Sequence, residues 1–330
     1  MPKGYVSCNV KGGLGNQLFQ IFATIAYGLR TGREIRFCFT EQIGNRSSYW
    51  HSFFKGLKPF QINQNDFIYI FYGGGGSGIM HQEPSYAYSE IPEYSNVANV
   101  LLDGYYQSRN YFEGYEKQIL GILGWEKGGI FGRRVGEGVD SPKIGMHFRI
   151  GDYKHIQHCH PLMPTAYYVD ALNECLKDHE ADLRRWKGAV ERLGGVVDDI
   201  MEVVYLCEDS DVGEVEKHLV VLRGTFPSLR FSRGLAGDLC CELGGVGERE
   251  CDRDWKEMAL LSQCDWFVIP NSSFSWWAAT FSGLLEDSGG SRLIDRGGHW
   301  VYYPSVWFGP TLAPSHDVRD MLNQPGWKRI

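Results

Sequence analysis

The stretch Lys143-Ile-Gly-Met-His-Phe-Arg-Ile-Gly-Asp-Tyr153 carries the pattern that decides the fold of this chain. Residues 143–148 have the composition of a buried strand, and Gly151 ends that strand. Arg149 therefore stands at the carboxyl end of the strand, where α/β sheets usually bind their ligands. Its guanidinium is a planar fork of donors suited to a diphosphate, and Asp152 is placed to hold that fork or share its charge. The alternative is an Arg149–Asp152 ion pair that only closes a loop.

The same alternation of strand and helix continues through both halves of the chain. We predict strands at residues 5–10, 35–39, 67–72, 99–103, 143–148, 201–207, 229–232 and 265–270. Helices are predicted to follow or separate them, ending near residues 32, 123, 186, 222 and 263, with a last one after residue 275. This order is typical of parallel sheets covered by helices on both faces. The glycine- and charge-rich segment 124–140 marks the expected boundary between two Rossmann-like, doubly wound domains, residues 1–140 and 141–330.

Composition places the chain among ordinary soluble globular proteins, because 43% of its 330 residues are hydrophobic and 22% are charged. A net charge of −7 argues against nucleic acid or an anionic membrane as the main partner. The nine cysteines include no Cys-x-x-Cys pair and no zinc-ligand spacing, so reduced core thiols are expected. No window approaches the ~20 apolar residues of a membrane span and no signal-peptide pattern is present. We therefore expect a cytoplasmic protein.

A glycine-rich turn, Gly12-Gly13-Leu14-Gly15-Asn16-Gln17, joins the first strand to the first helix. Glycines let the backbone approach a ligand closely, and the amides at a helix start favour negative charge. The turn fails the dinucleotide-binding pattern, because no glycine follows Gly15 at the third position and no acidic residue ends strand 35–39. It also lacks the Gly-Lys-Ser/Thr of a phosphate-binding loop. The alternative to an anion cradle is a tight turn without a ligand.

Two patterns in the second half bear on metal chemistry. Asp209-Ser210-Asp211 follows strand 201–207, where a sugar-nucleotide transferase of the GT-A class would hold a divalent metal. Carboxylates at this place more often cap the next helix. The loop with His155, His158 and His160 has no carboxylate around it, so a solvated loop is favoured and no metal site is predicted.

Five segments, two of which have been described above, occur in a characteristic order along the chain. They are Gly12-Gly13-Leu14-Gly15-Asn16-Gln17-Leu18-Phe19-Gln20, Gly104-Tyr105-Tyr106-Gln107-Ser108, His147-x-Arg149-x-Gly151-Asp152-Tyr153, Asp254-Trp255-x-Glu257-Met258 and Asn271-Ser272-Ser273-Phe274-Ser275-Trp276-Trp277. In that order they resemble the α-1,2-fucosyltransferases of glycosyltransferase family 11, over nearly the full length of the chain. The resemblance implies a GT-B fold, in which two Rossmann-like domains face a cleft and the second holds most of the sugar nucleotide.

The resemblance also implies the chemistry: an inverting transfer of L-fucose from GDP-β-L-fucose to a sugar hydroxyl, typically O2 of a galactose in an oligosaccharide or glycan. It implies no metal and no cofactor. Arg149 would hold the β-phosphate of the donor, with His147 and Asp152 shaping that site. The implied donor-binding residues are Gly13, Gly15, Asn16, Gln17, Glu208, Asp209, Asp265, Asn271, Ser272, Ser273 and Phe274. Among these, the three acidic residues are candidates for contacts with guanine or ribose.

One position departs from the family, because Ile150 stands where its members usually carry a second arginine. Another GDP-6-deoxyhexose such as GDP-rhamnose therefore stays open as the donor. A catalytically silent GDP-sugar-binding protein is the alternative from a different class. Without a metal, the charge of the departing nucleotide needs a fixed guanidinium and helix N-terminal amides. Two groups are candidates for accepting the proton of the acceptor hydroxyl: the carboxylate of Asp152 and the departing phosphate.

Overall fold

The computed structural model of the chain describes residues 4–44, 46–73, 78–125, 141–192, 200–235, 253–286 and 300–330. They form two compact units, each built on a parallel sheet, which confirms the predicted α/β class. The first unit takes its described residues from Met1–Gly129, Gly247–Trp255 and Ser315–Met321, and the second takes them from Ile130–Val246, Lys256–Pro314 and Leu322–Ile330. The predicted boundary at residue 140 ends a range, 126–140, that lies outside the described residues.

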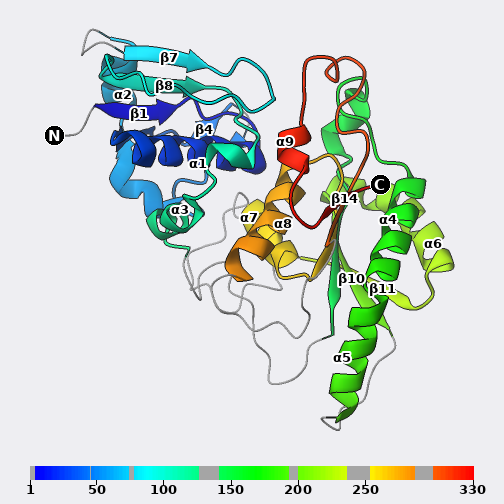
Figure 1. Cartoon of the computed structure of the whole chain (residues 1–330). Helices are drawn as coiled ribbons and strands as arrows, with labels where there is room; N and C mark the ends of the chain where they lie inside the picture. Colours follow the sequence, from blue (N-terminus) through cyan, green and yellow to red (C-terminus); the bar gives the residue numbers. More distant parts are fainter. Residues whose placement is uncertain are drawn as a thin grey trace. The chain divides into compact units, whose positions relative to one another are not determined.

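The first unit contains a four-stranded parallel sheet in the order β2-β1-β8-β7. Its strands are β1 (Tyr5–Cys8), β2 (Glu34–Ile35), β7 (Gly78–Gln82) and β8 (Asn99–Asp103). Helix α1 (Leu14–Thr31) connects β1 to β2 and runs beside the sheet (Figure 1). The helix ends at Gly32, whose left-handed φ of 68° suits a glycine just past a helix.

The other elements of the first unit are short. They are β3 (Phe37–Cys38), β4 (Gln42–Ile43), β5 (Arg46–Ser47), η1 (Lys55–Phe60), β6 (Gln61–Ile62), α2 (Gln64–Phe71), η2 (Arg109–Tyr111) and α3 (Glu116–Leu123). The predicted strand 35–39 is divided, because β2 stays in the main sheet while β3 pairs with β6.

The predicted strand at 67–72 is wrong, because those residues belong to helix α2. Asn63 stands at the N-terminus of the helix, where its side-chain oxygen accepts a hydrogen bond from the backbone N–H of Asp66. Phe67 and Phe71 are four residues apart, so they lie on one helical face, and their rings are 4.9 Å apart. A cap and an (i, i+4) aromatic pair together outweigh the strand propensity of the apolar run. The glycine-rich run that follows, residues 73–78, lies mostly outside the described residues.

The second unit contains a six-stranded parallel sheet in the order β11-β10-β9-β12-β13-β14. Its strands are β9 (Lys143–His147), β10 (Met201–Leu206), β11 (Leu229–Arg233), β12 (Trp266–Val268), β13 (Val301–Tyr303) and β14 (Trp327–Arg329). The chain first builds outward from β9 through β10 to β11 and then starts again on the other side of β9 with β12. The predicted doubly wound arrangement is therefore confirmed for this unit, and its order reverses between β9 and β12.

Helices cover both faces of this sheet (Figure 1). They are α4 (Thr165–Asp178), α5 (Glu180–Arg192), α6 (Val212–Thr225), α7 (Arg253–Ser262) and α8 (Ser273–Glu286), with the single turns η3 (Gly151–His155) and η4 (Asp209–Asp211). The short helix α9 (Arg319–Leu322) has its first three residues in the first unit. The predicted helix 164–186 is two helices, because His179 interrupts it. That histidine is buried, packs its ring 4.2 Å from Trp266 and bonds Asp182.

The side chains of β9 alternate between the two faces. Met146, Phe148 and Ile150 belong to a buried core with residues of α4 and α6. On the other face, a Cβ at Gly145 would lie 2.9 Å from Leu261 of α7, so only glycine fits between that helix and the strand. One face of β9 is therefore covered by α4 and α6, and the other by α7.

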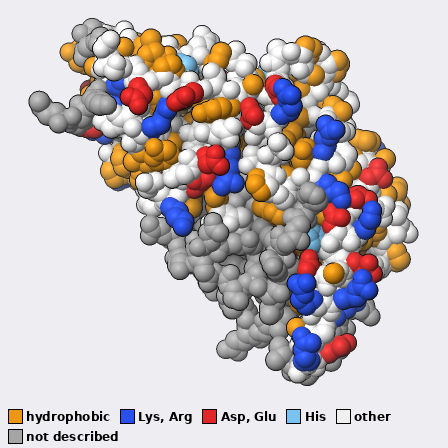
Figure 2. Space-filling model, viewed as in Figure 1, with side chains coloured by type: hydrophobic (Ala, Val, Ile, Leu, Met, Phe, Trp, Pro, Cys, Tyr) orange, Lys and Arg blue, Asp and Glu red, His pale blue; other side chains and the backbone are white. Residues whose placement is uncertain are grey.

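Among the described residues, no helix is long and apolar enough to cross a membrane. On the face seen in Figure 2, the side chains of Lys and Arg are interspersed with those of Asp and Glu.

Candidate functional site

The register of the second sheet brings three separate segments together around Arg149. Met146 pairs with Val268 across β9 and β12, so Arg149 and Asn271 both lie three residues beyond a paired position. His147 pairs with Leu206 across β9 and β10, so Arg149 and Glu208 both lie two residues beyond. In parallel strands these positions meet at the same edge, and this edge is where the strand order reverses.

The guanidinium of Arg149 is held from three sides. It donates one hydrogen bond to Asp152 and another to Glu208, and it stacks over the ring of Tyr153 at 4.9 Å. Its side chain is only 17% exposed. Burial lowers the pKa of Arg149, but Tyr153, Asp152 and Glu208 together outweigh that effect and raise it, so the charge is permanent. The arrangement is a fixed cation with two donors already aimed at carboxylate oxygens.

His147 lies on the same face of β9 as Arg149 and is 8% exposed. Its ring centre is 5.2 Å from that of Phe274, at the start of α8. Burial and then the charge of Arg149 lower the pKa of His147 to about 3, so the imidazole is neutral. Among the described residues its Nδ1 has no hydrogen-bond partner, although it is buried. A neutral imidazole with one unused nitrogen is suited to a ligand that brings a donor or an acceptor.

The start of α8 lies next to this cation. Tyr153 Oη donates a hydrogen bond of 3.2 Å to the carbonyl oxygen of Asn271, which ties the turn after β9 to the turn after β12. Asn271 is buried and donates to the carbonyl oxygens of Pro161 and Trp307, so it fixes the path of the chain into α8. Trp276 N donates to Ser272 O, closing the first helical turn. The first N–H groups of a helix have no acceptor inside the helix and favour an anion in front of them.

A buried carboxylate holds the Arg149 turn in place. Asp211 is 1% exposed and accepts hydrogen bonds from the backbone N–H of Gly151 at 2.6 Å and from Lys154 Nζ at 2.7 Å. Gly151 has φ of 28°, and a Cβ there would lie 2.9 Å from the carboxylate of Glu208. The turn 208–211 therefore holds Gly151 and Lys154, which follow Arg149 in the chain. This role for Asp211 was not predicted, because the Asp-x-Asp pattern indicates a metal ligand or, more often, a helix cap. Asp211 is the N-cap residue of α6, but its side chain makes no capping hydrogen bond.

The first unit has its own turn where its strand order reverses, between β1 and β8. Gln20 fixes the backbone of Lys11 through its side-chain amide, with distances of 2.9 and 2.8 Å. Asn16 Oδ1 accepts a hydrogen bond of 2.7 Å from Gln107, which joins the glycine-rich turn to the Gly104–Ser108 segment after β8. Lys11 also pairs with Asp103 at 3.0 Å.

The glycine-rich turn holds four of the predicted donor-binding residues, and all lie in the first unit. They are Gly13, Gly15, Asn16 and Gln17. Gly13 stands at the N-cap of α1, where a Cβ would meet no described atom within 4 Å. Gln17 is fully buried and donates to Gly12 O at 3.0 Å. Packing among the described residues therefore accounts for Gln17 but gives no reason for glycine at position 13.

The structure does not bring Asp265 to the same edge. Asp265 precedes β12 and its carboxylate accepts from the backbone N–H of Lys143 at 2.9 Å, so it joins the amino ends of β9 and β12. Asp209 lies near the site, but its Oδ1 accepts a hydrogen bond of 2.5 Å from the guanidinium of Arg233, and its side chain is 63% exposed. The two carboxylates of the Asp-x-Asp pattern thus serve different partners. The part of the chain that the structure describes contains no group of three or more His, Cys, Asp or Glu that could hold a metal ion.

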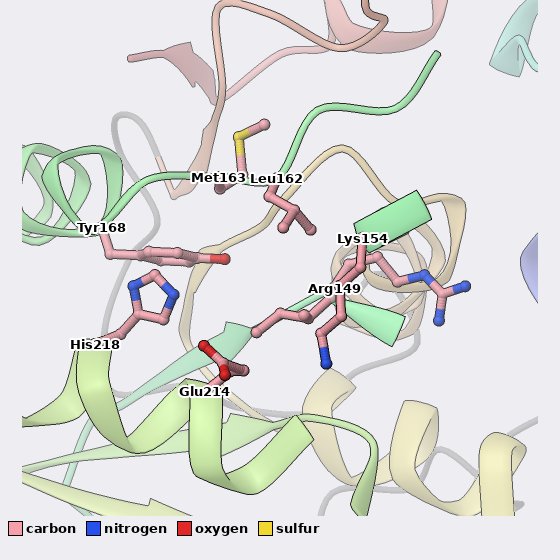
Figure 3. Close-up of a pocket in the computed structure, with 8 residues that line it drawn as sticks. Arg149, Lys154, Leu162, Met163, Tyr168, Glu214 and His218 are labelled. Atoms are coloured by element: carbon pink, nitrogen blue, oxygen red, sulfur yellow. The ribbon is translucent and has the colours of Figure 1, made fainter. Parts of the chain in front are cut away.

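A pocket of about 310 Å³ opens beside Arg149, on the face of the sheet covered by α4 and α6. Its lining residues come from the turn after β9, from η3, α4 and α6, and from the segment before α4: Arg149, Ile150, Lys154, Leu162, Met163, Tyr168, Glu214 and His218. Figure 3 shows Leu162 and Met163 across from Glu214, with Tyr168 and His218 together at one end and Arg149 and Lys154 at the other. We call it the Leu162 pocket.

Comparison with known families confirms the resemblance to glycosyltransferase family 11 over one part of the chain. The family model described as "Glycosyl transferase family 11" matches residues 244–287. Its described part includes α7, β12 and α8, and so contains the helix start beside Arg149. No curated protein sequence matches the chain.

Several solved structures are similar to the chain. A mutant of Arabidopsis thaliana FUT1 in complex with GDP has a TM-score of 0.45 at 14% identity, over 86% of this chain and 69% of that one. NodZ α-1,6-fucosyltransferase soaked with GDP-fucose has a TM-score of 0.38 at 14% identity, over 84% and 92%; another NodZ structure gives its source as Bradyrhizobium. POFUT1 in complex with GDP has a TM-score of 0.32 at 15% identity, over 88% and 97%.

Proposed function

We propose that the protein is an inverting, metal-independent glycosyltransferase that moves L-fucose from GDP-β-L-fucose to a sugar hydroxyl of a glycan, typically O2 of a galactose. The observation that carries this proposal is the meeting of a fixed guanidinium, Arg149, with the first turn of α8 at the carboxyl edge of the second sheet. The match of residues 244–287 to family 11 supports it, because that segment supplies the helix start.

The proposed site suits the departure of a nucleoside diphosphate. Breaking the bond between sugar and phosphate leaves negative charge on GDP, and the pair of Arg149 donors and the α8 amides would receive it. Since the Arg149 fork already faces two carboxylates, phosphate oxygens would take over positions that Asp152 and Glu208 occupy now. Asp152 is 51% exposed, so its carboxylate is accessible to an acceptor hydroxyl and could accept the proton of that hydroxyl.

The first test of this proposal is a panel of GDP-sugars with galactose-terminated acceptors, with GDP release and product formation both measured. We expect transfer of fucose that persists in excess EDTA. Transfer of rhamnose instead would change the donor, and loss of activity in EDTA would contradict the metal-free mechanism. GDP binding without transfer or donor hydrolysis would indicate a silent binding protein.

Arg149 is tested by Arg149→Lys, which keeps the charge but loses the planar fork. We expect transfer to fall by about 10²- to 10³-fold, as for loss of one group that stabilises the transition-state charge. The matched control is Arg223→Lys, because Arg223 is an exposed residue of α6 paired with Glu216 in the same unit. Normal turnover in the folded Arg149→Lys variant would contradict the role of Arg149.

A further inference from the structure

A second arginine stands at the carboxyl edge of the same sheet, two strands away from Arg149. Arg233 is the last residue of β11 and pairs with Tyr205 of β10. Its Nη2 donates to the carbonyl oxygen of Cys207 at 3.1 Å and to Asp209 Oδ1 at 2.5 Å. Its side chain is 22% exposed, close to the 17% of Arg149. The departure of the diphosphate, as proposed above, does not use this second fixed cation.

One turn connects the two guanidinium groups. Glu208, which accepts from Arg149, and Asp209, which accepts from Arg233, are consecutive residues. Neighbouring strands lie about 4.8 Å apart, so β9 and β11 are separated by roughly 10 Å. A nucleoside diphosphate covers a distance of this order, with its ribose between the phosphates and the base. A nucleotide whose diphosphate lies at Arg149 can therefore bring its base to Arg233.

The surroundings of the edge favour one direction for the nucleoside. Next to β12 the chain after β13 occupies the edge, because Trp307 O accepts from Asn271 at 2.9 Å and Trp307 is 6% exposed. Toward β10 the edge carries accessible acceptors, since the side chains of Glu208 and Asp209 are 50% and 63% exposed. In doubly wound sheets an acidic residue after the second strand binds the ribose, and β10 has that place here. The base then lies toward β11 and Arg233.

Packing alone gives little reason for an arginine at the end of β11. The ion pair with Asp209 has a partner that is mostly exposed, and such pairs contribute little to stability. The Nε of Arg233 is buried and has no hydrogen-bond partner among the described residues. Burial of a donor without an acceptor is unfavourable. A ligand that binds the guanidinium would account for its presence.

We propose that Arg233 reads the base of the donor nucleotide and selects guanine. This inference rests on the proposed function, because it assumes that the diphosphate binds at Arg149. Guanine presents O6 and N7 as two neighbouring acceptors that an arginine fork recognises, whereas adenine carries an amino donor in place of O6. Among the described residues, the hydrogen bonds of Arg233 to oxygen atoms come from Nη2, which leaves Nη1 for the base. The second acceptor of the base would replace Asp209 at Nη2.

The first experiment compares GDP with 7-deaza-GDP, in which a C–H group replaces N7. Affinities are measured by calorimetry for the wild type and for Arg233→Met, which loses the guanidinium. We expect the wild type to bind GDP at least about fivefold more tightly than 7-deaza-GDP, and Arg233→Met to bind the two within about twofold of each other. If the wild type does not distinguish the two ligands, or if Arg233→Met weakens both equally, the inference is overturned.

The second experiment alters the preference between bases. A glutamine side chain matches N6 and N7 of adenine as an arginine matches O6 and N7 of guanine. We expect the wild type to bind GDP about 10- to 100-fold more tightly than ADP, and Arg233→Gln to lower that ratio at least about fivefold. Urea denaturation shows whether the variant is folded. A ratio that stays the same in the folded variant overturns the inference.

The matched control is Arg230→Met. Arg230 is an exposed residue of the same strand, and it pairs with Glu202 three residues before the carboxyl end. We expect this variant to bind GDP, 7-deaza-GDP and ADP within about twofold of the wild type. A change in its GDP/7-deaza-GDP ratio as large as that of Arg233→Met would overturn the inference.

The same measurements separate this inference from the proposed function. If the wild type binds neither GDP nor 7-deaza-GDP, or if Arg149→Lys binds GDP and turns over as the wild type does, the proposed function itself fails. If the wild type transfers fucose from GDP-L-fucose while Arg233→Met leaves the GDP/7-deaza-GDP ratio unchanged, only the assignment of Arg233 fails.

Discussion

At the scale of single residues, the side chain of Arg149 is fixed in position by the residues around it before any ligand binds. Two carboxylates and one ring hold the guanidinium of Arg149, so little side-chain freedom remains to be lost when a diphosphate binds. The two interpretations of Arg149 in the sequence, an Arg149–Asp152 ion pair and a ligand site, are therefore compatible. Asp152 does pair with Arg149, and the pair lies at the edge where ligands bind.

His147 is the residue for which the structure makes a prediction about pH. Its pKa is about 3 when folded, because burial and Arg149 disfavour the imidazolium, and about 6.5 when unfolded. Between these values the unfolded chain binds a proton that the folded chain refuses, so stability falls as the pH falls from 6.5 toward 3. The slope from this group alone is at most about 1.4 kcal/mol per pH unit.

We expect His147→Gln to remove that contribution. The free energy of unfolding, measured by urea denaturation at several pH values from 7 to 4, should depend less on pH in the variant than in the wild type. His155→Gln is the control, because His155 is exposed in the neighbouring turn. Equal pH dependence in wild type and His147→Gln would show that His147 is not the group that resists protonation.

At the scale of elements, turn 208–211 determines the shape of the Arg149 turn. The buried carboxylate of Asp211 accepts two hydrogen bonds, and Asp211→Ala would leave the Gly151 N–H and the Lys154 ammonium without this acceptor. We expect this change to lower the free energy of unfolding by about 2–3 kcal/mol, the range for buried hydrogen bonds to a charged group, and to weaken GDP binding as Arg149 loses its position. Asp211→Asn, which still accepts from Gly151, should restore part of the stability.

The control for Asp211 is Glu216→Gln in helix α6, which follows η4. Glu216 pairs with Arg223 at the surface, so its loss should cost less than about 1 kcal/mol and leave GDP affinity unchanged. Asp211→Ala is measured by urea denaturation and by calorimetry with GDP. A variant that is destabilised but binds GDP with wild-type affinity would show that Asp211 supports the fold without positioning Arg149.

Helix α2 shows where sequence reasoning fails at this scale. The run at 67–72 is apolar and aromatic, which indicates a strand as readily as a helix, and Asn63 decides between them as an N-cap. We expect Asn63→Ala to lower the free energy of unfolding of the first unit by about 1 kcal/mol. Asn63→Ser should restore most of this. Asn63→Asp should restore less, because Asp66 lies 2.7 Å from the present amide. Equal stability of all four proteins in urea would contradict the cap.

At the scale of the whole molecule, strands and helices were predictable because their periods are local, whereas the strand order was not. Residues 143–148 and 265–270 read as buried strands, and both are found, but only pairing shows that they are neighbours. That pairing places Asn271 beside Arg149 and carries Asp265 to the far end of the strands. A carboxylate one residue before a strand and one just after it look alike in sequence, so Asp265 and Glu208 were grouped together although the sheet separates them.

The first unit also recruits a residue from far along the chain. Trp255 is 7% exposed and stacks on Phe53, with ring centres 5.8 Å apart and planes inclined by 18°. Phe53 in turn contacts Trp125 at 4.3 Å, so Trp255 completes an aromatic core whose other members come from the first 125 residues. Its neighbour Lys256 already belongs to the second unit. The two units therefore cannot be separated by one cut in the sequence without removing part of this core.

Trp255→Ala should consequently destabilise the first unit although position 255 lies in the second half of the sequence. We expect the two units to unfold in two transitions, of which GDP raises chiefly that of the second unit, because that unit contains Arg149 and α8. Trp255→Ala should lower the other transition, by about 3–5 kcal/mol as for loss of a buried aromatic side chain. Trp327→Ala, in β14 of the second unit, should instead lower the transition that GDP raises. Calorimetry with and without GDP distinguishes these outcomes, and a Trp255→Ala variant that lowers the GDP-sensitive transition would place this tryptophan in the wrong core.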